Sequence, residues 1–94
     1  MTFDRVAVTG VVDVLARRGA LDVIEALLQG PVPERQLVAG SRHVAASVAR
    51  QRVAELMRFG VVEAVPETGD LRLSPQGRRL QGLLEQLAAW SARG

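Results

Sequence analysis

The chain of 94 residues contains no cysteine, lysine, asparagine or tyrosine, and it has a single histidine, His43. The absence of cysteine excludes a disulfide framework, a thiol redox switch and a cysteine zinc site. One histidine is too few for a histidine-rich metal site, so we expect neither a metal nor a cofactor. No apolar run approaches the roughly 18 residues of a membrane span. Residues 1–4 also lack the basic start of a signal peptide, so we expect a cytoplasmic protein.

Length and composition indicate one globular domain. A typical domain has about 100–150 residues, so this chain has no room for two independent cores. Hydrophobic residues make up 48% and charged residues 23%, which is close to the globular average and argues against disorder. A chain this short buries only roughly 60–65% of its unfolded surface, so a partner subunit would add stability.

Charge is nearly balanced overall but unevenly distributed. Arginine supplies all 12 basic residues against 10 acidic residues, which gives a net charge of +2. Only the window 41–60 is clearly basic, with four arginines and a single acidic residue, Glu55. This pattern alone is also compatible with a solvated helix face, so its meaning depends on the fold around it.

Glycine and proline divide the chain into short elements, with no linker that could separate two domains. Residues 3–9 are rich in valine and precede Gly10, so both helix and strand remain open for them. Apolar residues at helical spacing predict helices over residues 11–17, 20–29, 34–39 and 44–59. The apolar face of the longest of these begins at Ala45 and ends at Leu56, and we expect it to be buried.

The following segment predicts a β-hairpin. Residues 61–65 and 71–73 have strand composition, and the sequence between them has turn chemistry. Alternation along the second strand places Leu71 and Leu73 toward the core and Arg72 on the outside.

A last helix is predicted over residues 75–91. Ser74 is suited to the N-cap, and Pro75 is suited to the first helical position. The apolar stripe of this helix consists of Leu80, Leu83, Leu84, Leu87 and Trp90. Because the stripe offers more apolar surface than one small core covers, we expect it to form a homodimer interface. The alternative is that the helix packs back onto its own domain.

The order of these elements predicts a mainly α fold with a small β-hairpin, the winged helix-turn-helix. A single domain over 1–94 would contain the helix-turn-helix at about 34–59, the wing at about 61–73 and the dimerisation helix at about 75–91. In this fold the longer helix of the pair places side chains in the DNA major groove. The only basic window coincides with this helix, so topology and charge both favour DNA binding.

Several segments have a pattern shared with a known family: VVDVL (11–15), QL (36–37), QRVAEL (51–56), GVVE (60–63) and LSPQGR (73–78). A leucine-rich helix ending near Trp90 follows them. Over roughly residues 11–90 the chain resembles the HxlR-type winged-helix transcriptional regulators of the broader MarR- and ArsR-like group. The resemblance implies a bacterial homodimer that binds a palindromic operator, with the terminal helices as the dimer interface.

The sequence also departs from that family's pattern. Gly19-Ala20 stands where members often carry a Lys-Trp pair, and Leu71 stands where a wing tyrosine is common. The wing tip is short and acidic, with Glu67 and Asp70. Because acidic side chains repel phosphate, the sequence does not decide whether the wing contacts DNA. Sensors of the family often use an N-terminal cysteine, which this chain lacks, so thiol sensing is excluded.

Candidate DNA contacts are polar residues of the predicted helix-turn-helix and wing: Arg42, His43, Ser47, Arg50, Gln51 and Arg72. Arg50 can pair with guanine or phosphate, and Gln51 can read adenine. Ser47 lies one turn before Gln51 and can bind phosphate or a base edge. Arg42 and His43 precede the helix and could touch phosphate near its start. For each of these residues, an exposed side chain without a partner is the alternative.

Two further predictions concern single arginines. Arg72 on the outer face of the wing is a candidate phosphate contact. Arg52 has the charge for DNA contact, but its structural alternative is an ion pair with Glu55 or Glu34.

We predict no enzyme, because a nucleophile needs a nearby base and the sequence contains no glycine-rich phosphate loop. The prediction is a sequence-specific, nucleoid-associated transcriptional regulator that reads a palindromic operator as a homodimer, with helix 44–59 in the major groove. Its partners would be double-stranded DNA and a second copy, and no residue marks a small-molecule effector. The alternative is a winged-helix protein-interaction module that does not bind DNA by itself. The modest net charge and the acidic wing favour that alternative.

Overall fold

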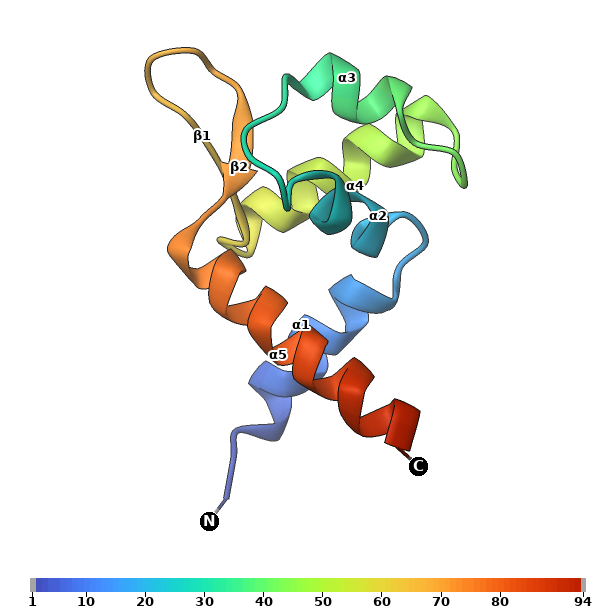
Figure 1. Cartoon of the computed structure of the whole chain (residues 1–94), viewed down its shortest axis with the longest axis vertical. Coiled ribbons are helices and arrows are strands. Elements are labelled where there is room, and N and C mark those ends of the chain that lie inside the picture. The colour runs from blue at the N-terminus through green and yellow to red at the C-terminus, as the bar shows by residue number, and fades with distance from the viewer. Residues whose placement is uncertain (1, 94) are drawn as a thin grey trace.

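The computed structural model describes residues 2–93, which form five helices and one two-stranded hairpin (Figure 1). In chain order the elements are α1 (Arg5–Ala16), α2 (Ala20–Ala26), α3 (Glu34–Ala39), α4 (Ala46–Arg58), β1 (Val62–Ala64), β2 (Leu71–Leu73) and α5 (Pro75–Arg93). This is the predicted winged helix-turn-helix, in which α3 and α4 form the pair and β1 and β2 form the wing. None of the described helices is long and apolar enough to cross a membrane.

Helix α1 extends further toward the N-terminus than predicted. It begins at Arg5, so most of the segment that the sequence left open is helical. The physical reason is a cap: the Asp4 side chain accepts a hydrogen bond from the backbone N–H of Ala7 at 3.1 Å. Gly10 lies inside the helix, where its cost of about 1 kcal/mol does not prevent helix formation.

Two predicted helices are shorter than expected. Helix α2 ends at Ala26, three residues before the predicted end, because the backbone leaves helical geometry at Leu27. The apolar spacing of residues 20–29 predicted Leu28 on the buried face of this helix, but Leu28 is 42% exposed. Helix α4 begins at Ala46 instead of near residue 44. Ala45 has an extended backbone (φ −65°, ψ 156°) and occupies the N-cap, so it lies outside the buried face.

The core is built around the inner face of α4. Val53 and Leu56 are the largest fully buried side chains, as their spacing predicts. Leu71 and Leu73 of β2 point into the same core, which confirms the predicted alternation of the wing strand. The core cluster comprises Val14, Val23, Ile24, Leu27, Leu37, Val53, Leu56, Val61, Val62, Leu71 and Leu73.

The wing is anchored by one pairing that the sequence did not predict. Strands β1 and β2 are antiparallel, with Glu63 opposite Arg72. Val32, in the loop before α3, forms a bridge to Leu71, with N–O distances of 2.8 and 2.9 Å. The base of the wing is therefore tied to the segment that precedes the helix-turn-helix.

Helix α5 is attached to the wing through Ser74 and Gly77. The buried Ser74 hydroxyl donates to the backbone carbonyl of Gly60 and accepts from the backbone N–H of Gly77 at 2.9 Å, which confirms the predicted N-cap. Gly77 lies directly against the carbonyl group of Val61, where no side chain would fit. From this junction α5 runs past α1 and away from the helix-turn-helix (Figure 1).

Candidate nucleic-acid interface

The outward face of α4 is polar and free of acidic side chains. Ala49, Val53 and Leu56 turn toward the core and fix how the helix is rotated. The opposite face is exposed and carries Ser47, Arg50, Gln51, Ala54 and Arg58. The sequence predicted this division, and it places three candidate contacts, Ser47, Arg50 and Gln51, on one accessible surface.

Glu55, the only acidic residue of the basic window, turns away from this surface. It is 5% exposed, and its carboxylate accepts hydrogen bonds from Arg17 and from Arg52, the latter at 3.0 Å. Arg52 also donates through Nε to the backbone carbonyl of Arg18 at 2.9 Å. The structural alternative for Arg52 is therefore confirmed. The link to Arg17 joins the end of α1 to α4, and no local pattern predicts it because the two residues are 38 positions apart.

Three arginines around α4 retain an uncompensated positive charge. Arg42, Arg50 and Arg58 are exposed, and none of them forms an ion pair within residues 2–93. Arg58 was not among the predicted contacts. Its signal was available in the sequence, because positions 50, 54 and 58 repeat every four residues and so lie along one helix face.

His43 lies in the turn before α4 and contacts an acidic residue of α2. Its Nδ1 atom is 3.0 Å from Oδ2 of Asp22, and both side chains are substantially exposed. This pair connects the start of α2 to the turn of the helix-turn-helix and leaves Nε2 of His43 for another partner. In the described part of the chain, no group of three or more acidic or histidine side chains could hold a metal ion.

The wing presents a different charge pattern from α4. Arg72 is exposed in part, but its Nε lies 2.8 Å from a carboxylate oxygen of Glu63 on the facing strand. The tip carries Glu67 and Asp70. Because the charge of Arg72 is already balanced within the hairpin, the wing has less attraction for phosphate than the outward face of α4.

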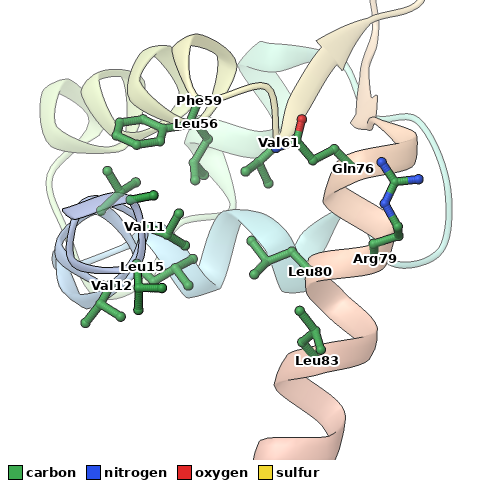
Figure 2. A pocket seen from close by; sticks show the side chains of 13 residues that line it. Val11, Val12, Leu15, Leu56, Phe59, Val61, Gln76, Arg79, Leu80 and Leu83 are labelled. Atoms are coloured by element: carbon green, nitrogen blue, oxygen red, sulfur yellow. The ribbon is translucent and has the colours of Figure 1, made fainter. Parts of the chain in front are cut away.

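The predicted dimer residues lie on α5 beside an apolar cavity. Leu83, Leu87 and Trp90 are strongly exposed, whereas Leu80 and Leu84 are half-buried. Leu80 and Leu83 line a cavity of about 470 Å³ between α1, the end of α4 and α5 (Figure 2). Leu80 packs against the core cluster of its own domain, whereas Leu83, Leu87 and Trp90 of the same stripe do not. A second copy on this surface stays a prediction.

The fold and the arginine-bearing face of α4 define a winged helix-turn-helix protein. Quinone-bound YodB from B. subtilis has a TM-score of 0.80 with this chain at 19% identity, and the match covers 94% of this chain and 98% of YodB. A transcriptional regulator assigned to the MarR family, from Enterococcus faecalis V583, also has a TM-score of 0.80, at 22% identity, covering 99% of this chain and 90% of that chain. The reduced form of YodB has a TM-score of 0.78 at 22% identity, covering 97% and 92% of the two chains.

At these identities the similarity shows the fold. No protein-family model matches the chain, and no curated protein sequence matches it. The predicted winged helix is confirmed as the fold, while membership of the MarR-like group and of the HxlR type stays a prediction.

Proposed function

We propose that this protein is a DNA-binding transcriptional regulator that acts as a homodimer and reads a two-fold symmetric operator with α4 in the major groove. The observation that carries the proposal is the charge arrangement around α4. Arg42, Arg50 and Arg58 remain exposed and unpaired within residues 2–93, while Glu55 is turned inward. A recognition helix held by a packed inner face, with cations and amide donors outside, is what major-groove reading requires.

The similar structures support the same class of function. YodB and the E. faecalis protein are transcriptional regulators, and their folds match this chain over almost its full length. One YodB structure contains quinone, and another was obtained after treatment with diamide, which oxidises thiols. This chain has no cysteine, so a response through thiol oxidation is not part of the proposal.

The experiment is selection of the purified protein on a random duplex DNA library, followed by sequencing of the retained DNA. We expect enrichment of a motif with two symmetric half-sites whose centres are about 34–36 Å apart. Arg50→Glu should abolish the enrichment because it places a negative charge against the DNA. The matched control is Arg93→Glu, which makes the same charge change at the end of α5 far from α4 (Figure 1) and should retain the motif.

Salt dependence gives an independent measurement. If each copy brings Arg42, Arg50 and Arg58 to the backbone, a dimer neutralises about six phosphates, and affinity should fall roughly 10³-fold between 50 and 200 mM salt. Absence of any enriched motif at 50 mM salt, with the fold intact by circular dichroism, would overturn the proposal. That result would favour the protein-interaction alternative, with a partner protein covering the outward face of α4.

A further inference from the structure

The turn before α4 holds the only histidine of the chain against an acidic residue of α2. Nδ1 of His43 lies 3.0 Å from Oδ2 of Asp22, which is 21 positions away in the sequence. The next residue of the turn, Val44, packs against the corner before α2, where a Cβ added at Gly19 would lie 3.1 Å from a methyl carbon of Val44. The position of His43 is therefore set by how α2 packs on the helix-turn-helix.

The contact with Asp22 determines which ring nitrogen of His43 carries a hydrogen. An ionised carboxylate only accepts hydrogen bonds, so Nδ1 of the ring donates to Asp22. In the neutral ring Nε2 then has a lone pair and no hydrogen, and a phosphate oxygen, which is also an acceptor, has no bond to make there. A second proton turns Nε2 into a charged donor, which is the form of the ring that binds phosphate.

Few other charges surround the ring in the part of the chain that the structure describes. Asp22 is the only charged group there within ion-pair distance of the ring. The charged residue that α4 places nearest to the turn is Arg52, which is held by Glu55 and by the backbone carbonyl of Arg18. Helix α3 contributes only one polar side chain, the uncharged Gln36, to the small crevice that Asp22 lines. The protonation of the ring is therefore governed by Asp22 and by whatever binds at Nε2.

The ring lies beside the surface that is proposed to bind DNA. The His43 side chain is 71% exposed, so Nε2 is accessible to a ligand. Its neighbour Arg42 is exposed and forms no ion pair within residues 2–93, and α4 begins three residues after His43. In a helix-turn-helix complex the first helix crosses the DNA backbone and the second lies in the major groove, so the turn between them lies next to phosphates. A DNA phosphate is therefore the ligand that the proposed complex brings to Nε2.

No other side chain of the chain changes its charge near neutral pH. Histidine ordinarily gains its proton between about pH 8 and pH 5. The sequence contains no cysteine, lysine or tyrosine, and arginine stays charged throughout this range. A pH dependence of DNA binding in the neutral range would therefore identify His43 among the side chains.

We propose that Asp22 and His43 form a proton-dependent phosphate contact: Asp22 holds the ring through Nδ1, and the protonated ring donates through Nε2 to a DNA phosphate beside the start of α4. Operator binding then takes up one proton in each copy of the chain. Asp22 is a positioning residue, because it acts through the ring and does not touch the DNA. The inference rests on the DNA binding of the proposed function and adds its regulation by pH.

The first measurement is the affinity of the wild-type protein for the duplex that it enriches from the random library at about pH 6. At one salt concentration, the affinity should be at least about 10-fold higher at about pH 6 than at about pH 8, because the bound ring holds its proton more tightly than the free ring. His43→Gln should have the same affinity at both pH values. His43→Arg carries a permanent charge, so it should also be independent of pH and should bind more tightly than the wild type at about pH 8.

The role of Asp22 is tested by the full pH profile of Asp22→Asn. The amide removes the negative charge that favours the protonated ring, so the fall in affinity with rising pH should occur at lower pH than in the wild type. Glu25→Gln is the matched control, because it makes the same charge change on the same exposed helix without a histidine partner. It should change the affinity by one factor at every pH. The same uniform change in Asp22→Asn would overturn the positioning role.

Salt dependence distinguishes a phosphate contact from a general effect of pH on the protein. Each neutralised phosphate adds about 0.9 to the slope of the logarithm of affinity against the logarithm of salt concentration. For a dimer with two protonated rings, the slope should therefore be steeper by about 2 at about pH 6 than at about pH 8. His43→Gln should have the same slope at both pH values. A wild-type slope that does not change with pH would overturn the phosphate contact.

The outcomes separate this inference from the proposed function. Equal wild-type affinity for the enriched duplex at both pH values would overturn the inference and leave DNA binding intact, and this comparison needs no variant. Absence of any enriched duplex at about pH 6, with the fold intact by circular dichroism, would overturn both. If the pair only ties α2 to the turn, His43→Gln should change the thermal stability and keep the wild-type pH profile of DNA binding, which would also overturn the inference.

Discussion

Substituting alanine for Gly77 should destabilise the fold strongly although it adds a single methyl group. A Cβ at this position would overlap the carbonyl oxygen of Val61 and would lie 3.1 Å from the carbonyl carbon of the same residue. That carbonyl cannot move freely, because its oxygen accepts a hydrogen bond from the backbone N–H of Ser74, with an N–O distance of 3.0 Å. Overpacking costs about 1–3 kcal/mol, and disturbing the bonds at Ser74 adds about 1 kcal/mol, so we expect a loss of about 2–4 kcal/mol.

Gly82→Ala is the matched control for this prediction. The position lies in the same helix and a Cβ there would meet nothing within 4 Å, so alanine should stabilise the helix by about 0.5–1 kcal/mol. Thermal unfolding by circular dichroism at one fixed protein concentration should show Tm falling by roughly 10–25 °C for Gly77→Ala and rising by a few degrees for Gly82→Ala. Equal shifts for the two variants, or a change below about 0.5 kcal/mol at Gly77, would refute the close-contact argument.

Three further outcomes follow from the ion pairs and from the apolar stripe of α5. Glu55→Gln removes the negative charge that Arg17 and Arg52 share and replaces one of the two accepting oxygens with a donor, so it should cost about 1–3 kcal/mol in urea unfolding. The exposed Glu85→Gln should change stability by less than about 0.5 kcal/mol. Arg72→Ala should weaken DNA binding less than about 3-fold because Glu63 already balances its charge, against at least about 10-fold for Arg50→Ala in the same titration. Trp90→Ala should weaken DNA binding by about 100-fold or more although α4 is untouched, since two linked half-sites are replaced by one.

Much of the fold follows from local signals in the sequence. The α3 helix, the second wing strand and the Ser74 cap were predicted at the residues where the structure has them, because each depends on neighbours within a few positions. The sequence pattern did not predict the start of α1, because a valine-rich run after Asp4 does not mark Asp4 as an N-cap. Ala45 was assigned to the buried face because apolar spacing alone does not mark where a helix begins.

The candidate site was predictable in its direction but not in its pairings. Spacing placed Arg50 and Gln51 on the outward face of α4, which the structure confirms. The partners of Glu55 and His43 come from α1 and α2, 38 and 21 residues away, and such contacts depend on how the helices pack. Counting charges along the sequence therefore cannot tell which arginines are engaged in the structure and which are left for a ligand.

The pattern of ion pairs links the proposed DNA binding to the proposed dimer. Glu55 engages Arg52 and Arg17, and Glu63 engages Arg72, so within residues 2–93 the exposed cations left on α4 and in the turn before it are Arg42, Arg50 and Arg58. About three phosphate contacts give weak binding at physiological salt. With an acidic wing that adds no attraction, one copy has too few contacts to hold a specific site. A second copy doubles the number of contacts and fixes the half-site spacing, so the apolar stripe of α5 is as necessary to the proposed function as the arginines of α4.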